Sequence, residues 1–306
     1  MFSALKSMRP RWLPRLASAN RSLHTSRSYP IAINPSKSEI QAGRLTSENL
    51  EIAIRSLYHD GLVMVTDVIP HETLDHLNKK MAEDAYKLYS RKDSPFNYNP
   101  NNLQQDAPPM KEFFNSKIFM NPIATQITST ALGPCPKWTF CSGNTAMPPT
   151  SENPPVSQPV HTDADFDHPI WLGTHQDTNL SFQEGQHGER ASGRIKKEEL
   201  EQRRAIRPPC QPVVPKGSIV IRDLRLWHAG VGNQTDEARV MLAMIHFAPW
   251  YRNPMKLEFA DDLKETIEEE KDLEIPVEWV SKNDVAGQYL NRAFGNAYDF
   301  SQGSRS

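Results

Sequence analysis

Gln158-Pro-Val-His-Thr-Asp163 and, much later in the 306-residue chain, Trp227-His228 are the segments from which a fold can be predicted. Together they offer two imidazole nitrogens and one carboxylate, from His161, His228 and Asp163. On one face of a metal, these ligands form the facial triad of a non-haem Fe(II) site, which leaves the opposite positions open. A structural zinc site is closed by four protein ligands, usually including thiolates. Iron is favoured because the three cysteines have no metal-binding spacing (Cys135, Cys141 and Cys210).

An arginine after His228 fits the same kind of site. When 2-oxoglutarate chelates iron, its far carboxylate needs a cation in fixed geometry, and the planar fork of arginine provides one. Arg239 lies eleven positions after His228, and the glycines and asparagine between them allow a turn. This spacing allows a hairpin, and Arg239 can enter the pocket of His228 if His228 ends the preceding strand with its ring inward. The strand after the turn would place alternate residues on one face: Arg239, Met241, Ala243 and Ile245.

Three segments resemble the phytanoyl-CoA dioxygenase family, in particular its fungal branch of small-molecule oxygenases. They are Gln158–Asp163, Lys216-Gly-Ser-Ile-Val-Ile-Arg-Asp223 and Trp227–Arg239. The resemblance covers residues 45–250 and implies a mainly β fold with flanking helices. Within that class the implied architecture is the double-stranded β-helix, the jelly-roll arrangement shared with cupins.

The same resemblance implies Fe(II) as the metal and 2-oxoglutarate as the cosubstrate. By position, His161, Asp163 and His228 match the iron ligands of the family, and Arg239 matches the cosubstrate arginine. Gln158 matches a position that contacts the cosubstrate in some relatives.

The sequence departs from the family at one place. Relatives carry a further core strand and a Glu-Asn-Gly-like turn after the His-x-Asp segment, but here Asp165–Pro169 runs directly into Ile170–His175. Buried backbone groups without partners cost about 1 to 3 kcal/mol each, so such a loss weakens a barrel. Either the chain is an exon-skipped or mispredicted version of an active enzyme, or another segment fills the gap. We therefore expect a jelly roll that lacks one core strand unless another segment replaces it.

Composition limits the function classes. A chain of 306 residues with 38% hydrophobic residues can bury one sizeable core or two modest ones. The formal net charge of -2 gives no general reason to expect a nucleic-acid partner. The chain has no apolar stretch of the roughly 20 residues that a membrane helix needs. The odd cysteine count fits a reducing compartment. The expected partners are a small-molecule substrate and O2.

Residues 1–30 differ in composition from the rest of the chain. They contain six cations and several serines, and the first acidic residue is Glu39. This composition is typical of a mitochondrial transit peptide, and a disordered basic leader is the alternative. The prediction is a leader over residues 1–30, a single dioxygenase-like domain over residues 31–306, and a location in the mitochondrial matrix, with the cytoplasm as the alternative.

The remaining elements follow from periodicity and caps. We expect a helix that begins at Thr46 or Ser47 and ends at Gly61, a strand over Leu62–Val65, and a second helix that opens at Pro70. Residues 91–110 predict a long surface loop, either a lid over the site or a connector. We also expect a helix after Pro122 and strands at 137–140 and 219–221. Charged helices are expected within 184–207 and 261–274. N-terminal helices and a C-terminal helical tail should flank the domain.

These features predict an Fe(II)/2-oxoglutarate-dependent dioxygenase that oxidises a small, largely apolar metabolite and releases succinate and CO2. Two alternatives remain open. One is a non-catalytic small-molecule-binding relative with an incomplete barrel, and the other is a cupin-like hydrolase that uses another divalent metal. Turnover of 2-oxoglutarate separates the first function from both alternatives.

Overall fold

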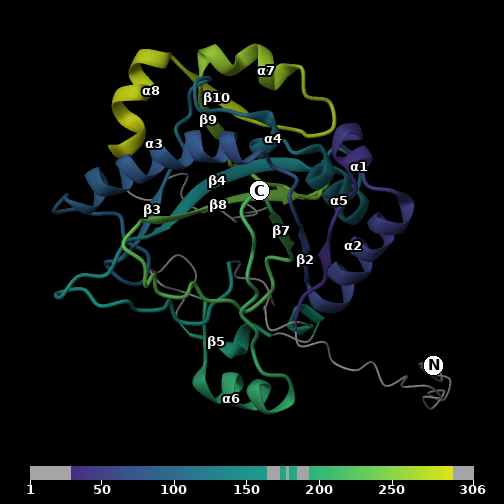
Figure 1. Cartoon of the computed structure of the whole chain (residues 1–306), viewed down its shortest axis with the longest axis vertical. Helices are drawn as coiled ribbons and strands as arrows, with labels where there is room; N and C mark the ends of the chain where they lie inside the picture. The colour runs from purple at the N-terminus through teal and green to yellow at the C-terminus, as the bar shows by residue number, and fades with distance from the viewer. Residues whose placement is uncertain (1–28, 164–172, 177–178, 185–192, 292–306) are drawn as a thin grey trace, which may run out of the picture.

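The computed structural model describes residues 29–163, 173–176, 179–184 and 193–291 (Figure 1). Residues 1–28 of the predicted leader (1–30) and the shortened junction between Pro169 and Ile170 lie outside these ranges. Two three-stranded and two two-stranded sheets carry flanking helices, which agrees with a mainly β fold at the level of class. Within the described part of the chain the strands do not close into one barrel.

The N-terminal elements form because their caps and apolar stripes agree. Helix α2 (Ser47–Asp60) begins after Thr46, whose side chain accepts a hydrogen bond from the Asn49 amide. It ends at Gly61, which has a φ of 77°, a left-handed conformation that glycine adopts without strain. The predicted helix and the following strand β2 (Leu62–Val65) are both confirmed. Before them lie β1 (Ala32–Ile33) and α1 (Lys37–Ala42).

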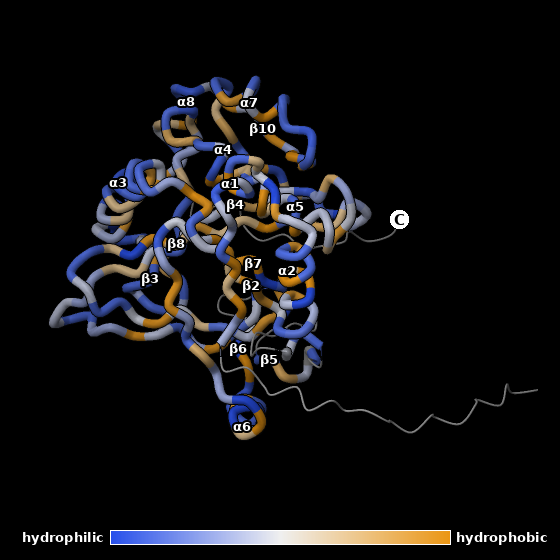
Figure 2. Tube along the Cα trace, turned by 45° about the vertical axis from the view of Figure 1, so that its right-hand side comes forward, coloured by the Kyte–Doolittle hydropathy of each residue, from blue (hydrophilic) through white to orange (hydrophobic). Residues whose placement is uncertain are grey.

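The first sheet has the order β1-β2-β7 and brings distant parts of the chain together. Strand β7 (Ile219–Arg222) pairs with β2 in antiparallel orientation, with Leu62 opposite Arg222. Figure 2 shows β2 and β7 as apolar stretches, as expected for strands that pack into a core. The predicted strand at 219–221 is therefore confirmed and is one residue longer. Its last residue, Arg222, lies where the chain turns toward His228.

A second sheet, with the order β3-β4-β8, supports the centre of the molecule. It consists of β3 (Asn102–Gln105), β4 (Lys137–Ala146) and β8 (Arg239–Phe247), so β4 is longer than predicted. Helix α3 (His71–Tyr89) lies across one face of it (Figure 1). On that face Val240, Leu242 and Met244 pack into the main core. The predicted alternation along β8 is confirmed, because Met241 on the other face is 53% exposed.

Two predictions about this sheet are wrong. The first assigned residues 91–110 to a surface loop, but Asn102–Gln105 form a fully buried strand. The polar strand can be buried because its side chains find partners: the Asn102 amide donates to the Asn97 carbonyl and the Gln105 amide donates to the Met81 carbonyl. A periodicity of apolar residues does not detect such a strand.

The second wrong prediction is the hairpin between His228 and Arg239. Strand β8 pairs with β4, with Ala146 opposite Arg239, and not with the segment that contains His228. His228 instead forms an isolated antiparallel bridge with His161. The turn residues Gly230–Asn233 therefore connect the bridge at His228 with the strand β8 that pairs with β4. Asn233 reaches the end of β4, since its side-chain amide donates to the Ala146 carbonyl.

The C-terminal elements cover the sheet face that carries α3 (Figure 1). Strands β9 (Leu257–Ala260) and β10 (Val277–Val280) are parallel partners. The predicted acidic helix over 261–274 is shorter than expected, since only Asp261–Leu263 and α7 (Lys264–Glu268) are helical. Leu273, between α7 and β10, is buried. Beyond them lie α8 (Lys282–Gln288) and the 3-10 turn Tyr289–Asn291; α4 (Ser116–Phe119) and the predicted helix α5 (Pro122–Leu132) complete this side.

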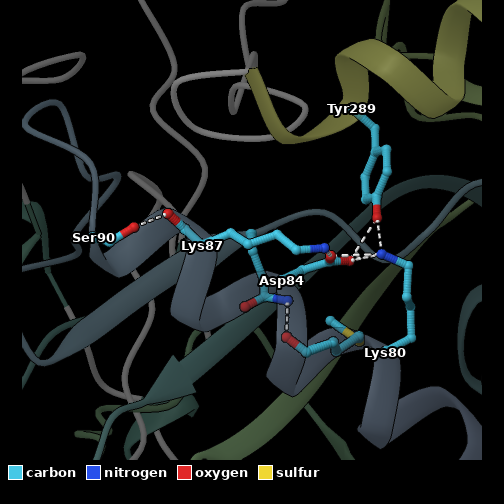
Figure 3. Close-up of polar contacts among 7 residues, drawn as sticks. Lys80, Asp84, Lys87, Ser90 and Tyr289 are labelled. Atoms are coloured by element: carbon cyan, nitrogen blue, oxygen red, sulfur yellow. Dashed lines mark hydrogen bonds and ion pairs between the residues drawn. The ribbon is translucent and has the colours of Figure 1, made fainter.

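A buried ion pair ties the C-terminal turn to α3 (Figure 3). The Asp84 side chain is fully buried, and its carboxylate accepts hydrogen bonds from Lys80 at 2.5 Å and from the Tyr289 hydroxyl at 2.5 Å. Because a buried carboxylate is stable only when it is paired, these contacts fix Tyr289 against α3. Burial and the neighbouring Asp84 raise the pKa of Tyr289.

Strand β5 (Gln183–Glu184) and helix α6 (Lys197–Ile206) lie at the opposite end of the molecule (Figure 1). Strand β6 (Arg194–Ile195) pairs with β5. Two short 3-10 turns, Thr174–Gln176 and Leu180–Phe182, are also described in this part of the sequence. Helix α6 has no buried residue, which agrees with the predicted solvated charged helix but shortens it. In the ranges that the structure describes, no helix is both long and apolar enough to span a membrane.

Candidate metal centre

His161 and His228 are brought together by a pair of backbone hydrogen bonds. The His161 amide donates to the His228 carbonyl at 2.9 Å, and the His228 amide donates to the His161 carbonyl at 3.0 Å. In such a hydrogen-bonded antiparallel pair the two side chains point to the same side. The ring centroids are consequently 4.3 Å apart.

Asp163 completes the group. Its Oδ1 atom lies 3.9 Å from Nε2 of His161 and 3.3 Å from Nε2 of His228. One possible ligand atom from each of the three residues lies within 4.8 Å of the other two. The structure thus brings together the three residues that the sequence selected, 67 positions apart along the chain at the widest.

The far nitrogens of both rings face backbone carbonyl oxygens. Nδ1 of His161 is 2.8 Å from the Pro159 carbonyl, and Nδ1 of His228 is 3.2 Å from the Leu226 carbonyl. Donation from Nδ1 to a carbonyl leaves the Nε2 lone pair free, which is the usual arrangement of a metal-binding histidine. The two Nε2 atoms and Oδ1 of Asp163 therefore fit a divalent metal with two nitrogen ligands and one carboxylate.

The electrostatics of the group keep it ready for a cation. Burial, followed by the nearby His228, lowers the pKa of His161 to about 3, so the ring is neutral at neutral pH. Burial raises the pKa of Asp163, but the Arg222 guanidinium and His228 outweigh it and hold that pKa well below its usual range. Neutral imidazoles and an ionised carboxylate are the protonation states that bind metal.

Arg222 is the site residue that sequence reasoning missed. It is the last residue of β7, and its Nη2 atom donates to Oδ2 of Asp163. Its Nη1 atom lies 3.4 Å from Nδ1 of His228. The signal in the sequence is the charged pair Arg222-Asp223, which follows the apolar run Ile219–Ile221 shortly before His228. Reasoning from metal-ligand spacing gives that pair no role.

Tyr98 forms part of the wall around the centre. Its ring centroid is 4.7 Å from that of His161, and the Arg194 guanidinium carbon lies 5.8 Å from the tyrosine ring. Tyr98 has a φ of 65°, which is an uncommon conformation for a residue with a side chain. Burial, followed by the charge of Asp163, raises the pKa of Tyr98. The segment that we interpreted as a lid or a connector therefore reaches the metal ligands.

Gln158 connects the same two segments of chain. Its amide donates to the Gly230 carbonyl at 2.8 Å, and its Oε1 atom accepts from the Gly230 amide at 2.9 Å. The side-chain Nε2 atom is buried and finds no hydrogen-bond partner in the described part of the chain. The structure therefore gives Gln158 a role in holding the segment of His228, and its contact with a cosubstrate stays a prediction.

Arg239 is placed differently from the other candidates. It begins β8, its side chain is exposed, and its Nη2 atom donates to the Val231 carbonyl at 2.8 Å. The arginine that contacts Asp163 directly is Arg222. The role of Arg239 as cosubstrate anchor stays a prediction.

Comparison with known proteins supports the fold. No family model matches the sequence. The chain is similar to the epimerase SnoN, solved in complex with Fe3+, alpha ketoglutarate and nogalamycin RO, with a TM-score of 0.50 and 13% identity over 66% of this chain and 84% of that one. A second structure of SnoN, described as a non-heme alpha ketoglutarate dependent epimerase from nogalamycin biosynthesis, gives a TM-score of 0.48 and 13% identity over 66% and 82%. EvdMO1 gives a TM-score of 0.45 and 17% identity over 65% of this chain and 50% of that one. The first of these places the chain in a sheet-rich fold with flanking helices.

Proposed function

We propose that this protein is an Fe(II)/2-oxoglutarate-dependent dioxygenase that oxidises a small, largely apolar metabolite. The observation that carries the proposal is the group formed by His161, Asp163 and His228, whose possible ligand atoms lie within 4.8 Å of one another. The fold likeness to SnoN supports it, because the SnoN structure contains Fe3+ and alpha ketoglutarate. The three segments that resemble the phytanoyl-CoA dioxygenase family add further support.

Each residue of the centre has a defined task in this proposal. His161 and His228 present Nε2, and Asp163 presents Oδ1, while their other polar atoms are engaged by Pro159, Leu226 and Arg222. When bound, Fe(II) and 2-oxoglutarate supply oxidation by O2 with release of succinate and CO2.

Two further residues are assigned to the cosubstrate. Arg239 would bind its far carboxylate through the planar fork of the guanidinium. Gln158 would donate from its buried Nε2 atom, which finds no partner in the described part of the chain. Tyr98, packed on His161, would exclude water from one side of the centre.

Conversion of 2-oxoglutarate tests the proposal. Protein loaded with Fe(II) is incubated with 2-oxoglutarate and O2, and succinate is quantified by mass spectrometry with a panel of apolar metabolites. We expect succinate to form with the wild-type chain and to fall to background with Asp163→Ala. Iron binding without succinate formation would instead support a non-catalytic binding relative, which the unclosed arrangement of the described strands also allows. Hydrolysis of a substrate without use of 2-oxoglutarate would support a metal-dependent hydrolase.

The cellular location is a separate proposal. Residues 1–30 are rich in arginine and serine and lack acidic residues, which is the composition of a mitochondrial transit peptide. We propose import into the matrix with removal of the leader, so that the mature chain starts between Thr25 and Ile31. Mass spectrometry of the protein from its native cell tests this, and an intact Met1 with cytosolic fractionation would contradict it.

A further inference from the structure

The two oxygens of the Asp163 carboxylate have different partners. Oδ1 faces Nε2 of His161 at 3.9 Å and Nε2 of His228 at 3.3 Å. Oδ2 accepts a hydrogen bond from Nη2 of Arg222. The Asp163 side chain is 16% exposed, so the pair forms where little water competes with it.

Arg222 can hold this position because the fold fixes its backbone. It is the last residue of β7, paired with Leu62 of β2, and its side chain is 23% exposed. The side chain thus extends from a strand of the first sheet to the loop that carries Asp163. A contact between two separate parts of the fold fixes orientation better than a contact along one flexible loop.

The contact of Arg222 with His228 clarifies the proton positions. Nη1 of Arg222 lies 3.4 Å from Nδ1 of His228, whereas the Leu226 carbonyl is closer, at 3.2 Å. An arginine can only donate, so the two contacts require opposite tautomers of the ring. A metal on Nε2 selects the tautomer in which Nδ1 donates to Leu226. Arg222 then keeps its hydrogen bond to Asp163 as its main contact in the site.

We propose that Arg222 is a positioning residue that restricts Asp163 to binding a metal through one oxygen. The inference rests on the proposed metal centre, which it makes more specific. A carboxylate free to rotate can bind a metal through both oxygens and occupy an additional position. With Oδ2 retained by Arg222, an octahedral metal keeps three positions for a cosubstrate and a further ligand, which an oxygenase needs.

Loaded with Mn(II), the intact protein tests this without turnover. Mn(II) shares the preference for octahedral sites, and the relaxation rate of water protons reports how many waters bind it directly. We expect three such waters in the wild type and two in Arg222→Met, a fall of about one third in the inner-sphere contribution. The affinity for Mn(II) is a poor readout, because Arg222→Met removes two things with opposite effects on it. One is the hydrogen bond that orients Asp163, and the other is a positive charge that repels the cation.

Three comparisons complete the experiment. Arg222→Lys retains a donor for Oδ2, and we expect it to restore most of the third water, which also keeps the inference testable if Arg222→Met fails to fold. Arg225→Gln is the matched control, because Arg225 lies in the turn that follows β7 and pairs with Asp223 at 2.6 Å outside the centre. Three waters should remain in that variant. His228→Ala should greatly weaken Mn(II) binding, and undiminished binding would contradict the proposed metal centre itself.

Addition of 2-oxoglutarate separates two roles for Arg222. If Arg222 positions Asp163, the cosubstrate displaces two waters in the wild type and also binds to Arg222→Met. If Arg222 instead anchors the cosubstrate, Arg222→Met keeps three waters and 2-oxoglutarate no longer displaces them. That result, or two waters in the wild type, would overturn the inference while leaving the metal centre in place.

Discussion

The sheet β3-β4-β8 and the metal centre beside it are stabilised in different ways. Trp138 and Leu103 in the sheet are completely buried, and the main apolar core packs against the face that α3 covers. The centre instead depends on single polar contacts, such as the bridge between His161 and His228 and the pair between Arg222 and Asp163. Apolar packing therefore determines stability, whereas a few hydrogen bonds determine the geometry of the metal ligands.

The largest expected effect separates function from stability. His228→Ala removes one of two nitrogen ligands, so we expect iron binding and 2-oxoglutarate turnover to fall to background. The free energy of unfolding of the metal-free protein should change by less than about 1 kcal/mol, since no core contact is lost. Anaerobic iron titration and thermal unfolding measure the two quantities. Global unfolding of His228→Ala would show that the two regions are not independent.

The converse substitution lies in the sheet. Trp138→Ala removes a fully buried indole and its hydrogen bond from Nε1 to the Phe140 carbonyl at 2.9 Å. We expect a loss of about 3 to 5 kcal/mol in the free energy of unfolding, measured with denaturant. Trp138→Phe, which retains most of the volume, should lose less. The fraction that remains folded should still bind one iron per chain, and loss of iron from that fraction would contradict the comparison.

The arginine at the start of β8 gives an intermediate effect. Arg239→Lys keeps the charge and loses the planar fork, so we expect the 2-oxoglutarate requirement to rise about tenfold while iron affinity stays nearly constant. Initial rates of succinate formation against cosubstrate concentration measure it. Lys256→Arg, a change at another exposed cation, is the control. An unchanged requirement would assign the cosubstrate to a different cation.

The smallest effect concerns acid stability on the covered side of β8. Burial lowers the pKa of His246 to about 4, and its Nδ1 atom lies 3.0 Å from the Thr128 hydroxyl. Between pH 4 and 6.5 the unfolded chain binds this proton and the folded chain does not, so stability falls as the pH falls. Because the side chain is partly exposed, we expect His246 to account for about 1 kcal/mol of the free energy of unfolding that is lost between pH 7 and pH 5. His246→Gln should remove that contribution. The same pH dependence of unfolding in His246→Gln and in the wild type would contradict this prediction.

Sequence reasoning succeeded where local chemistry determines structure. Thr46 and Gly61 at the ends of α2 carry their own capping signals, and the alternation along β8 shows its two faces. Sequence reasoning also selected the three residues that the structure brings together as a possible metal centre, because their chemical types are specific. The pairing of the strands could not be predicted, because nothing in the sequence near His228 indicates that β8 pairs with β4 and not with the segment of His228.

The failures share a physical cause, since polar side chains become structural only through partners that are distant in sequence. Strand β3 is buried because Gln105 donates to the Met81 carbonyl of α3. Arg222 belongs to the centre because β7 pairs with β2 and directs it toward Asp163. Neither contact leaves a periodic signal in the chain. Predicting them requires the tertiary arrangement first.

An anaerobic titration of iron and 2-oxoglutarate tests the central claim most directly. A 2-oxo acid that chelates Fe(II) produces visible charge-transfer absorption, so one optical experiment reports metal, cosubstrate and stoichiometry together. We expect the band to saturate at one iron per wild-type chain and to be absent from His228→Ala and Asp163→Ala. A band of equal intensity in those variants, or no band in a wild-type chain that unfolds cooperatively, would contradict the assignment of His161, Asp163 and His228 as the iron site.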